Sequence, residues 1–210
     1  MSEKQAGDRR LEAGVKAPRW AWWVATGFGS GYLKPAPGTW GSLAALILWC
    51  ALLITPWYLP GTPGCRLPGT PWYHDSMVGI VWLLTPVLVA FGIWSSNLVV
   101  DETGIKDPGY IVIDEWAGLW IALLPSSLMV GGCMYLIRGW NNPSWILICP
   151  IFVPFLLFRL FDIWKPWPIF KLKSLPRGWG VVVDDLMAGL YAAMVTVALL
   201  PWFPSGPGKA

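Results

Sequence analysis

Long apolar segments constrain this chain more than any other feature of its sequence. A transmembrane helix needs about 20 mostly apolar residues to cross the hydrocarbon core of a bilayer. Only 13% of the residues are charged, whereas soluble domains carry about 25%. We therefore expect an all-α, multi-pass transmembrane bundle of about five spanning helices, at 41–59, 77–100, 113–136, 144–161 and 184–203.

The N-terminal region departs from this pattern. Residues 1–19 are polar and have no apolar core, which argues against a secretory signal peptide and predicts a disordered tail. The segment 26–42 contains too many Gly and Pro residues for an ordinary span, and the apolar run 20–25 is too short to cross. We expect this part to be interfacial or re-entrant, and residues 20–205 to form a single membrane-embedded domain.

Charged residues are divided unevenly between the two sides that five spans define. Twelve of the 15 Lys and Arg residues lie on the side of the N-terminus, so the positive-inside rule makes that side cytoplasmic. All but one of the 12 acidic residues lie on the same side, although that rule does not require it. Several of these acids stand at the predicted helix ends, where ionisable residues at membrane depth are rare and usually functional.

The acidic residues predict a metal site on the cytoplasmic face. Clustered carboxylates repel one another unless a cation neutralises them, and Mg²⁺ prefers oxygen ligands while keeping water or phosphate oxygens. Helix N-capping is the alternative explanation, since Asp and Glu are favoured in the first turn of a helix. The predicted metal ligands are Asp107, Asp114, Glu115, Asp184 and Asp185.

Basic and Gly-rich segments predict a phosphate site beside this metal. Arg159, Asp162 and Lys165 are spaced to share one helical face, and Arg and Lys both bind phosphate. The alternative is an Arg–Asp–Lys ladder whose bases reach toward lipid headgroups. Gly-rich turns expose backbone N–H groups that can hold an anion. The phosphate-binding candidates are Arg159, Lys165, Gly29, Ser30, Gly38, Thr39, Gly41 and Ser42.

A hypothesis for catalysis follows from these residue types. A bound divalent ion would polarise the phosphate and lower the pKa of a water, while Arg159 and Lys165 would neutralise the charge that develops on the phosphoryl group. Asp162 would orient these two bases or act as ligand or base. The catalytic candidates are thus Asp114, Asp162, Arg159 and Lys165, and either water or an aspartate could attack phosphorus.

Other chemistries fit less well. The single histidine, His74, falls on the opposite side from the acids, which argues against a histidine nucleophile, and the cysteines lack the spacing of a zinc site. The sequence contains no nucleic-acid-binding module and no P-loop lysine motif. A transferase of phospho-headgroups between lipids stays open. An ion-coupled transporter is also open, although the acids of a transporter site are expected near mid-span, whereas the acids of this chain stand at predicted helix ends.

Four sequence blocks resemble the phosphatidylglycerophosphatase A family of bacterial membrane lipid phosphatases. They lie at 25–45, 106–123, 158–169 and 178–193, and include DPGYIVIDE, FRLFDIWKPWPI and GWGVVVDDLMAG in that order. The resemblance implies a Mg²⁺-dependent enzyme of phospholipid biosynthesis in the bacterial inner membrane. Its substrate would be the membrane lipid phosphatidylglycerophosphate, hydrolysed to phosphatidylglycerol and phosphate. One departure is Pro176-Arg177-Gly178, where the family tends to have Gly-Gly.

Overall fold

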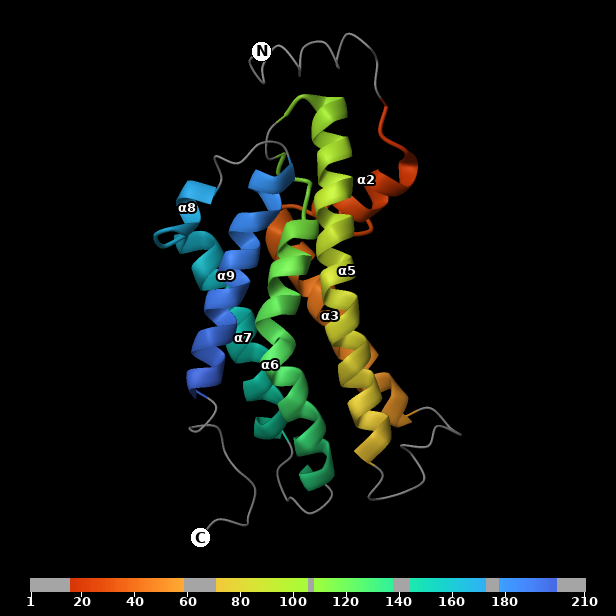
Figure 1. The fold of residues 1–210 in the computed structure, drawn as a ribbon, viewed down its shortest axis with the longest axis vertical. Helices are drawn as coiled ribbons and strands as arrows, with labels where there is room; N and C mark the ends of the chain where they lie inside the picture. The colour runs from red at the N-terminus through yellow and green to blue at the C-terminus, as the bar shows by residue number, and fades with distance from the viewer. Residues whose placement is uncertain (1–15, 59–70, 106–107, 138–143, 173–177, 200–210) are drawn as a thin grey trace.

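The computed structural model describes residues 16–58, 71–105, 108–137, 144–172 and 178–199, and all regular secondary structure within these ranges is helical (Figure 1). The all-α prediction is therefore confirmed for this part of the chain. The predicted tail lies mostly outside it, because residues 1–15 are not described. The division into a tail and one domain stays a prediction.

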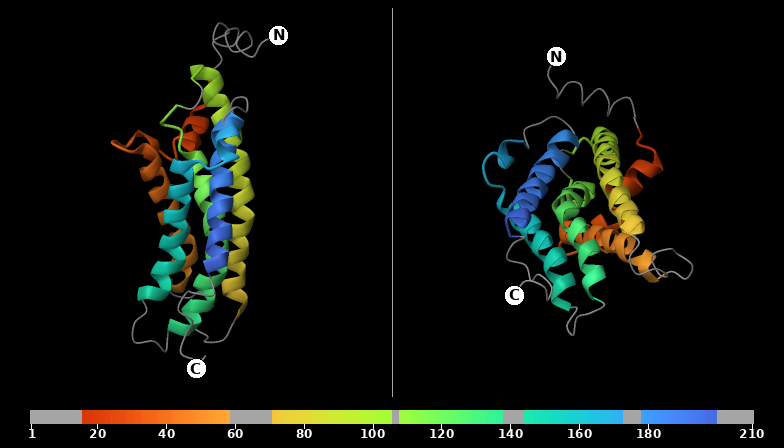
Figure 2. Two further views of the ribbon diagram at one scale, coloured as in Figure 1. Left: turned by 90° about the vertical axis from the view of Figure 1, so that its left-hand side faces the viewer. Right: turned by 60° about the horizontal axis from the view of Figure 1, so that its bottom comes forward.

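Five long helices run side by side and form the bundle (Figure 2). Each overlaps one of the apolar segments predicted to span. Three short elements accompany them at one end of the bundle, namely α2 (Arg19–Ala25), η1 (Ser30–Tyr32) and α8 (Ile169–Leu172). The long helices are α3 (Pro37–Tyr58), α5 (Pro71–Thr103), α6 (Ile113–Ile137), α7 (Ser144–Trp164) and α9 (Gly178–Leu199).

Among the described residues, two helical segments are long and apolar enough to cross a membrane, Val78–Thr103 in α5 and Gly178–Leu199. In the most apolar window of the first, only 28% of the residues are buried, which is too little for the core helix of a soluble protein. Large apolar side chains such as Ile47, Leu83 and Leu156 point outward from α3, α5 and α7. Such a surface suits contact with lipid, whereas a crossing by all five helices remains a prediction.

Helix α9 begins six residues earlier than the apolar segment predicted. The backbone N–H of Gly178 donates to Oδ1 of Asn97 in α5 at 3.0 Å, which satisfies a donor at the start of the helix. The site is tight, because a Cβ at Gly178 would lie 2.7 Å from the backbone nitrogen of Asn97. Because α9 begins at Gly178, Asp184 and Asp185 lie more than one turn inside the helix rather than at its first residues.

Glycines let helices α6 and α9 approach closely. A Cβ at Gly118 would lie 2.5 Å from the carbonyl oxygen of Asp185, and one at Gly189 would lie 2.1 Å from the carbonyl oxygen of Gly118. Small residues at a helix contact allow the two backbones to come together. This contact brings Asp185 toward the first turn of α6.

The Gly-rich N-terminal segment packs against the residues that lead into α6. Val112 donates its backbone N–H to the carbonyl oxygen of Ala25 at 2.9 Å. Gly27 and Gly29 have positive φ values of 54° and 92°, a conformation that suits glycine. Glu102 at the end of α5 holds α2 through Trp22, whose Nε1 donates to Oε2 at 2.7 Å. Whether the segment is interfacial or re-entrant stays a prediction.

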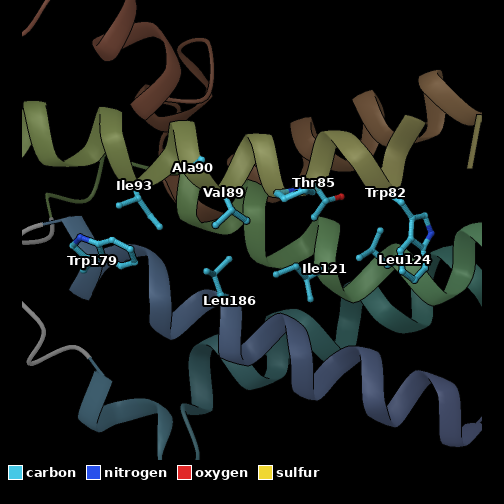
Figure 3. A pocket seen from close by; sticks show the side chains of 10 residues that line it. Trp82, Thr85, Val89, Ala90, Ile93, Ile121, Leu124, Trp179 and Leu186 are labelled. Carbon is cyan, nitrogen blue, oxygen red and sulfur yellow. The ribbon is translucent and has the colours of Figure 1, made fainter. Parts of the chain in front are cut away.

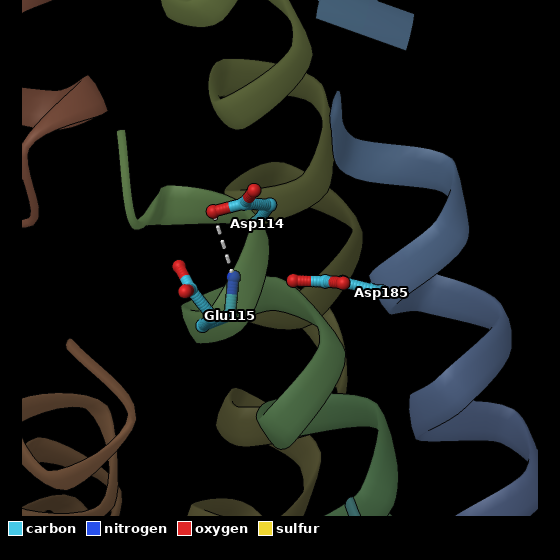
Figure 4. Close-up of side chains that lie close together, drawn as sticks. All are labelled: Asp114, Glu115 and Asp185. Atoms are coloured by element: carbon cyan, nitrogen blue, oxygen red, sulfur yellow. Dashed lines mark hydrogen bonds between the residues drawn. The ribbon is translucent and has the colours of Figure 1, made fainter. Parts of the chain in front are cut away.

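An apolar groove of about 630 Å³ lies between α5, α6 and α9 (Figure 3). Trp82, Val89 and Trp179 are among the side chains that line it. Leu186 points into this groove (Figure 3). Its neighbour Asp185 points instead toward the first turn of α6 (Figure 4), so α9 presents an apolar side chain to the groove and a carboxylate to the site described next.

Candidate functional site

Three acidic side chains from two helices meet at one end of the bundle. Asp114 and Glu115 stand in the first turn of α6, and Asp185 approaches them from α9 (Figure 4). One carboxylate oxygen from each of the three lies within 4.8 Å of the others. Asp114 and Asp185 are only 6% and 3% exposed. Carboxylates so close and so buried are stable together only if a positive charge compensates them or some of them are protonated.

The donor set fits a hard divalent cation such as Mg²⁺, because all three groups offer carboxylate oxygens and no thiolate or imidazole takes part. Oε2 of Glu115 is buried and has no hydrogen-bond partner among the described residues. Helix capping explains part of the arrangement, since Oδ1 of Asp114 accepts the backbone N–H of Glu115 at 3.0 Å. It does not explain why Asp185 from another helix joins them.

Lys165 pairs with the two aspartates of α9. Its Nζ donates to Asp184 and, at 3.2 Å, to Oδ1 of Asp185. Oδ1 of Asp162 lies 3.5 Å from the same Nζ. Burial disfavours the charged form of Lys165, but the carboxylates of Asp185 and Asp184 outweigh it and raise the pKa of Lys165 above its ordinary value. The lysine is therefore a fixed positive charge.

Asp184 and Asp185 thus have different surroundings. Adjacent residues on a helix point about 100° apart, so the two carboxylates can share one neighbour and still differ in their others. Asp185 is part of the acidic trio with Asp114 and Glu115, whereas Asp184 is not. Both contact Lys165. The structure places Asp185 as the residue shared between the trio and the lysine.

Arg159 connects the trio to the start of α3. Its Nη1 donates to Oδ2 of Asp162 at 2.7 Å and to Oγ of Ser42 at 3.2 Å, and its Nη2 lies 3.5 Å from Oγ1 of Thr39. A Cβ at Gly38 would lie 2.2 Å from Oε1 of Glu115 and 3.6 Å from Nη2 of Arg159. The N-terminus of α3 and the guanidinium of Arg159 therefore lie beside Glu115, one member of the acidic trio.

The predicted Arg159–Asp162–Lys165 ladder is present, with ion pairs on both sides of Asp162. The two bases of the ladder also contact neighbouring helices. Arg159 continues it to Ser42 in α3 and Lys165 continues it to α9. The ladder is thus part of the site.

The structure does not bring every predicted residue to this site. Gly38, Thr39 and Ser42 lie beside Arg159, but Gly41 packs on Val112. Oγ of Ser30 donates to the carbonyl oxygen of Gly27 at 2.8 Å, and a Cβ at Gly29 would meet nothing within 4 Å. Asp107 and its predicted role lie outside the described residues.

Two positioning residues, Gly118 and Gly189, were not among the predicted site residues. A signal for them exists, because each acidic pair is followed about one turn later by the same Ala-Gly-Leu sequence, at 117–119 and 188–190. A small residue about one turn after an acidic pair, repeated on two helices, predicts that these helices pack closely next to their acids.

The fold and the site define a class of protein: a helical bundle with a membrane-type outer surface and a buried acidic site that suits a cation, lined by one lysine and one arginine. Comparison with known proteins gives the family. A sequence model of the family described as phosphatidylglycerophosphatase A matches residues 23–200. The chain belongs to this family.

Curated relatives match most of the chain. A phosphatidylglycerophosphatase A of Haemophilus influenzae is 34% identical, over 85% of this chain and 88% of its own. A phosphatidylglycerophosphatase A of Escherichia coli is 28% identical, over 87% and 85%. A Bacteroides thetaiotaomicron protein, provisionally named a phosphatidylinositol-3-phosphatase, is 33% identical over 85% and 92%. No solved structure matches the chain.

Proposed function

We propose that this phosphatase hydrolyses the phosphomonoester of phosphatidylglycerophosphate to phosphatidylglycerol and phosphate, and that it requires Mg²⁺. One observation carries the proposal: in a chain of this family, Asp114, Glu115 and Asp185 cluster together, and Glu115 lies beside Arg159 and the N-terminus of α3. Carboxylates that suit a divalent cation beside an arginine and a helix N-terminus match the needs of a phosphoryl group.

The residues take distinct roles in this proposal. Asp114, Glu115 and Asp185 would hold Mg²⁺, which when bound polarises a phosphate oxygen and lowers the pKa of a coordinated water. Arg159 binds the phosphate oxygens and neutralises the charge that develops on them. The backbone N–H groups at Gly38 and Thr39 in the first turn of α3 add donors for the same anion.

Asp162 and Lys165 position the others. Asp162 accepts a hydrogen bond from Arg159 and pairs with Lys165, so it fixes both cations. Lys165 holds Asp184 and Asp185 in place and offsets part of the negative charge of the site. The main role of Lys165 in this proposal is to hold the carboxylates, because its Nζ already contacts three acids. Contact with the phosphate is its secondary role.

We further propose that the five long helices cross the bacterial inner membrane with this site at the cytoplasmic headgroup level. The acidic trio, Arg159 and Lys165 all lie near one end of the long helices. Exposed Trp164 and Trp167 stand beside Lys165 at that end, and Trp side chains favour the membrane interface. The charge count along the sequence supports the cytoplasmic side.

Phosphatidylinositol 3-phosphate is a second candidate substrate because the Bacteroides relative is provisionally named for it. Both lipids carry a phosphomonoester on a headgroup that a phosphodiester joins to diacylglycerol. The choice between them is therefore a choice of headgroup rather than of reaction.

Phosphate release from defined lipids tests the proposal. Purified protein in detergent micelles would receive phosphatidylglycerophosphate or phosphatidylinositol 3-phosphate, with Mg²⁺ and no acceptor lipid. We expect equal amounts of phosphatidylglycerol and free phosphate from the first, and far less product from the second and from the Asp114→Asn variant. Absence of free phosphate would overturn the proposal. Turnover that appears only after an acceptor lipid is added would identify a transferase.

A further inference from the structure

A second cavity, of about 610 Å³, lies at the end of the bundle that carries the acidic trio. It forms where the segment leading into α3 meets the segment leading into α6. The contact between these segments is tight, because a Cβ at Gly31 would lie 2.1 Å from the carbonyl oxygen of Tyr110. Tyr32, Lys34, Pro37 and Tyr110 are among the residues that line this cavity, which we call the Tyr32–Lys34 pocket.

The wall of this pocket continues into the proposed active site. Pro37 lines the pocket, and the next residue, Gly38, faces Oε1 of Glu115 and Nη2 of Arg159. Consecutive Cα atoms are about 3.8 Å apart, so the backbone that lines the pocket leads directly into the backbone that faces the site. A ligand with two anionic groups could occupy both.

The lining of the pocket combines aromatic rings with one cation. The rings of Tyr32 and Tyr110 lie 6.1 Å apart, and Trp22 stacks on Tyr110 from behind at 5.6 Å. Tyr32 and Lys34 are exposed. Aromatic side chains with a polar tip suit the boundary between headgroups and hydrocarbon. This mixture matches the part of a phospholipid where a phosphodiester meets diacylglycerol.

We propose that the Tyr32–Lys34 pocket binds the phosphodiester end of the lipid substrate and that Lys34 neutralises that phosphate. The inference rests on the proposed function, because phosphatidylglycerophosphate carries its phosphodiester one glycerol unit away from the phosphomonoester that is cleaved. With the terminal phosphate at Arg159, the inner phosphate falls toward Pro37 and Lys34. The pocket thereby favours lipids with two phosphates over phosphatidic acid, which has no phosphodiester.

Substitution of Lys34 tests the inference. We expect Lys34→Gln to raise the KM for phosphatidylglycerophosphate about tenfold, as expected for a lost charge-assisted hydrogen bond, with kcat little changed. Binding of phosphatidylglycerol, which keeps the phosphodiester but lacks the phosphomonoester, should weaken by the same factor. Lys16→Gln is the matched control, because Lys16 is another exposed lysine and its neighbour Ala17 bonds to Glu102 of α5 rather than to the pocket.

A second variant fills the pocket. Gly109 lines it, and a Cβ there meets nothing within 4 Å, so Gly109→Leu should fold normally. We expect it to weaken binding of phosphatidylglycerol while hydrolysis of a soluble phosphomonoester such as glycerol 3-phosphate stays unchanged.

The outcomes separate this inference from the proposed function. Hydrolysis of phosphatidylglycerophosphate with unchanged KM and phosphatidylglycerol binding in Lys34→Gln would overturn the pocket and keep the function. If both variants lose phosphatidylglycerol binding but the wild-type protein releases no phosphate, the proposed function would be overturned and the pocket would stand. If Lys16→Gln weakened phosphatidylglycerol binding as much as Lys34→Gln, exposed lysines would attract anionic lipid in general. That result would also overturn the pocket.

Discussion

Lys165 donates a hydrogen bond from Nζ to Oδ1 of Asp185 at 3.2 Å, joining the residue that follows α7 to the carboxylate that α9 contributes to the acidic trio. The same Nζ also bonds to Asp184. Because only Asp185 lies in the trio, the two neighbouring aspartates serve different groups. This division separates metal binding from positioning and can be tested residue by residue.

Asp185→Asn and Asp184→Asn form a matched pair, since each removes one charge from adjacent positions. We expect Asp185→Asn to raise the Mg²⁺ concentration for half-maximal phosphate release by about 100-fold, because it removes a ligand. Asp184→Asn should raise it by only about tenfold, the lower end of the range for outer-shell changes. The measurement is activity against Mg²⁺ concentration, and equal shifts in the two variants would contradict the division.

Gly38→Ala should impair activity with little loss of stability. The added Cβ would lie 2.2 Å from Oε1 of Glu115, so this carboxylate must move away from Asp114 and Asp185. We expect kcat/KM to fall about 10- to 100-fold, the range seen when the support of metal ligands is disturbed. Gly79→Ala in α5 is the control, because its Cβ meets nothing within 4 Å. A fully active Gly38→Ala would show that Glu115 needs no fixed position.

Lys165→Met should lower thermal stability by an amount that hardly varies across neutral and mildly alkaline pH. Nearby carboxylates raise the pKa of Lys165 in the folded protein. A raised folded pKa contributes stability that is fully present below the unfolded pKa of about 10.4, and it is lost as pH rises through the folded pKa.

The midpoint of thermal unfolding in detergent, compared between wild type and Lys165→Met, checks this expectation. The difference should stay constant from about pH 7 to about pH 9.5 and shrink only at higher pH. A difference that already shrinks near pH 8 would mean that Lys165 loses its proton in the working range. Lys165 would then not be a fixed positive charge.

Gly189→Ala should separate α6 from α9. The new Cβ would lie 2.1 Å from the backbone carbonyl oxygen of Gly118, which no side-chain rotation can relieve. We expect a loss of about 1–3 kcal/mol of stability, typical of overpacking, together with a higher Mg²⁺ requirement because Asp185 moves with its helix. Unfolding in detergent and Mg²⁺ activation measure the two effects. Unchanged Mg²⁺ activation would show that this contact does not position Asp185.

The apolar segments were enough to predict an all-helical fold and the approximate place of each long helix. They could not predict where α9 begins, because Gly178 joins the helix through a bond to Asn97, 81 positions earlier in the chain. Hydropathy describes which residues avoid water, whereas this boundary depends on a side chain from α5.

The residue types of the site and the pairing of Asp162 with both bases were also predicted, but the partners of these bases on other helices were not. The sequence placed Lys165 and Arg159 together on the phosphate. In the structure Arg159 reaches Ser42 of α3 and Lys165 reaches Asp184 and Asp185 of α9. Spacing along one helix shows that the two bases share a face. That spacing does not show which helix packs against each end of the face.

The most direct test of the central claim is phosphate release from phosphatidylglycerophosphate by protein that a chelator has stripped of metal. We expect negligible release after stripping and full recovery when Mg²⁺ is added back. The Asp114→Asn, Glu115→Gln and Asp185→Asn variants should each need far more Mg²⁺ for the same recovery. Undiminished release by stripped wild-type protein, with the chelator still present, would contradict the proposed requirement for Mg²⁺.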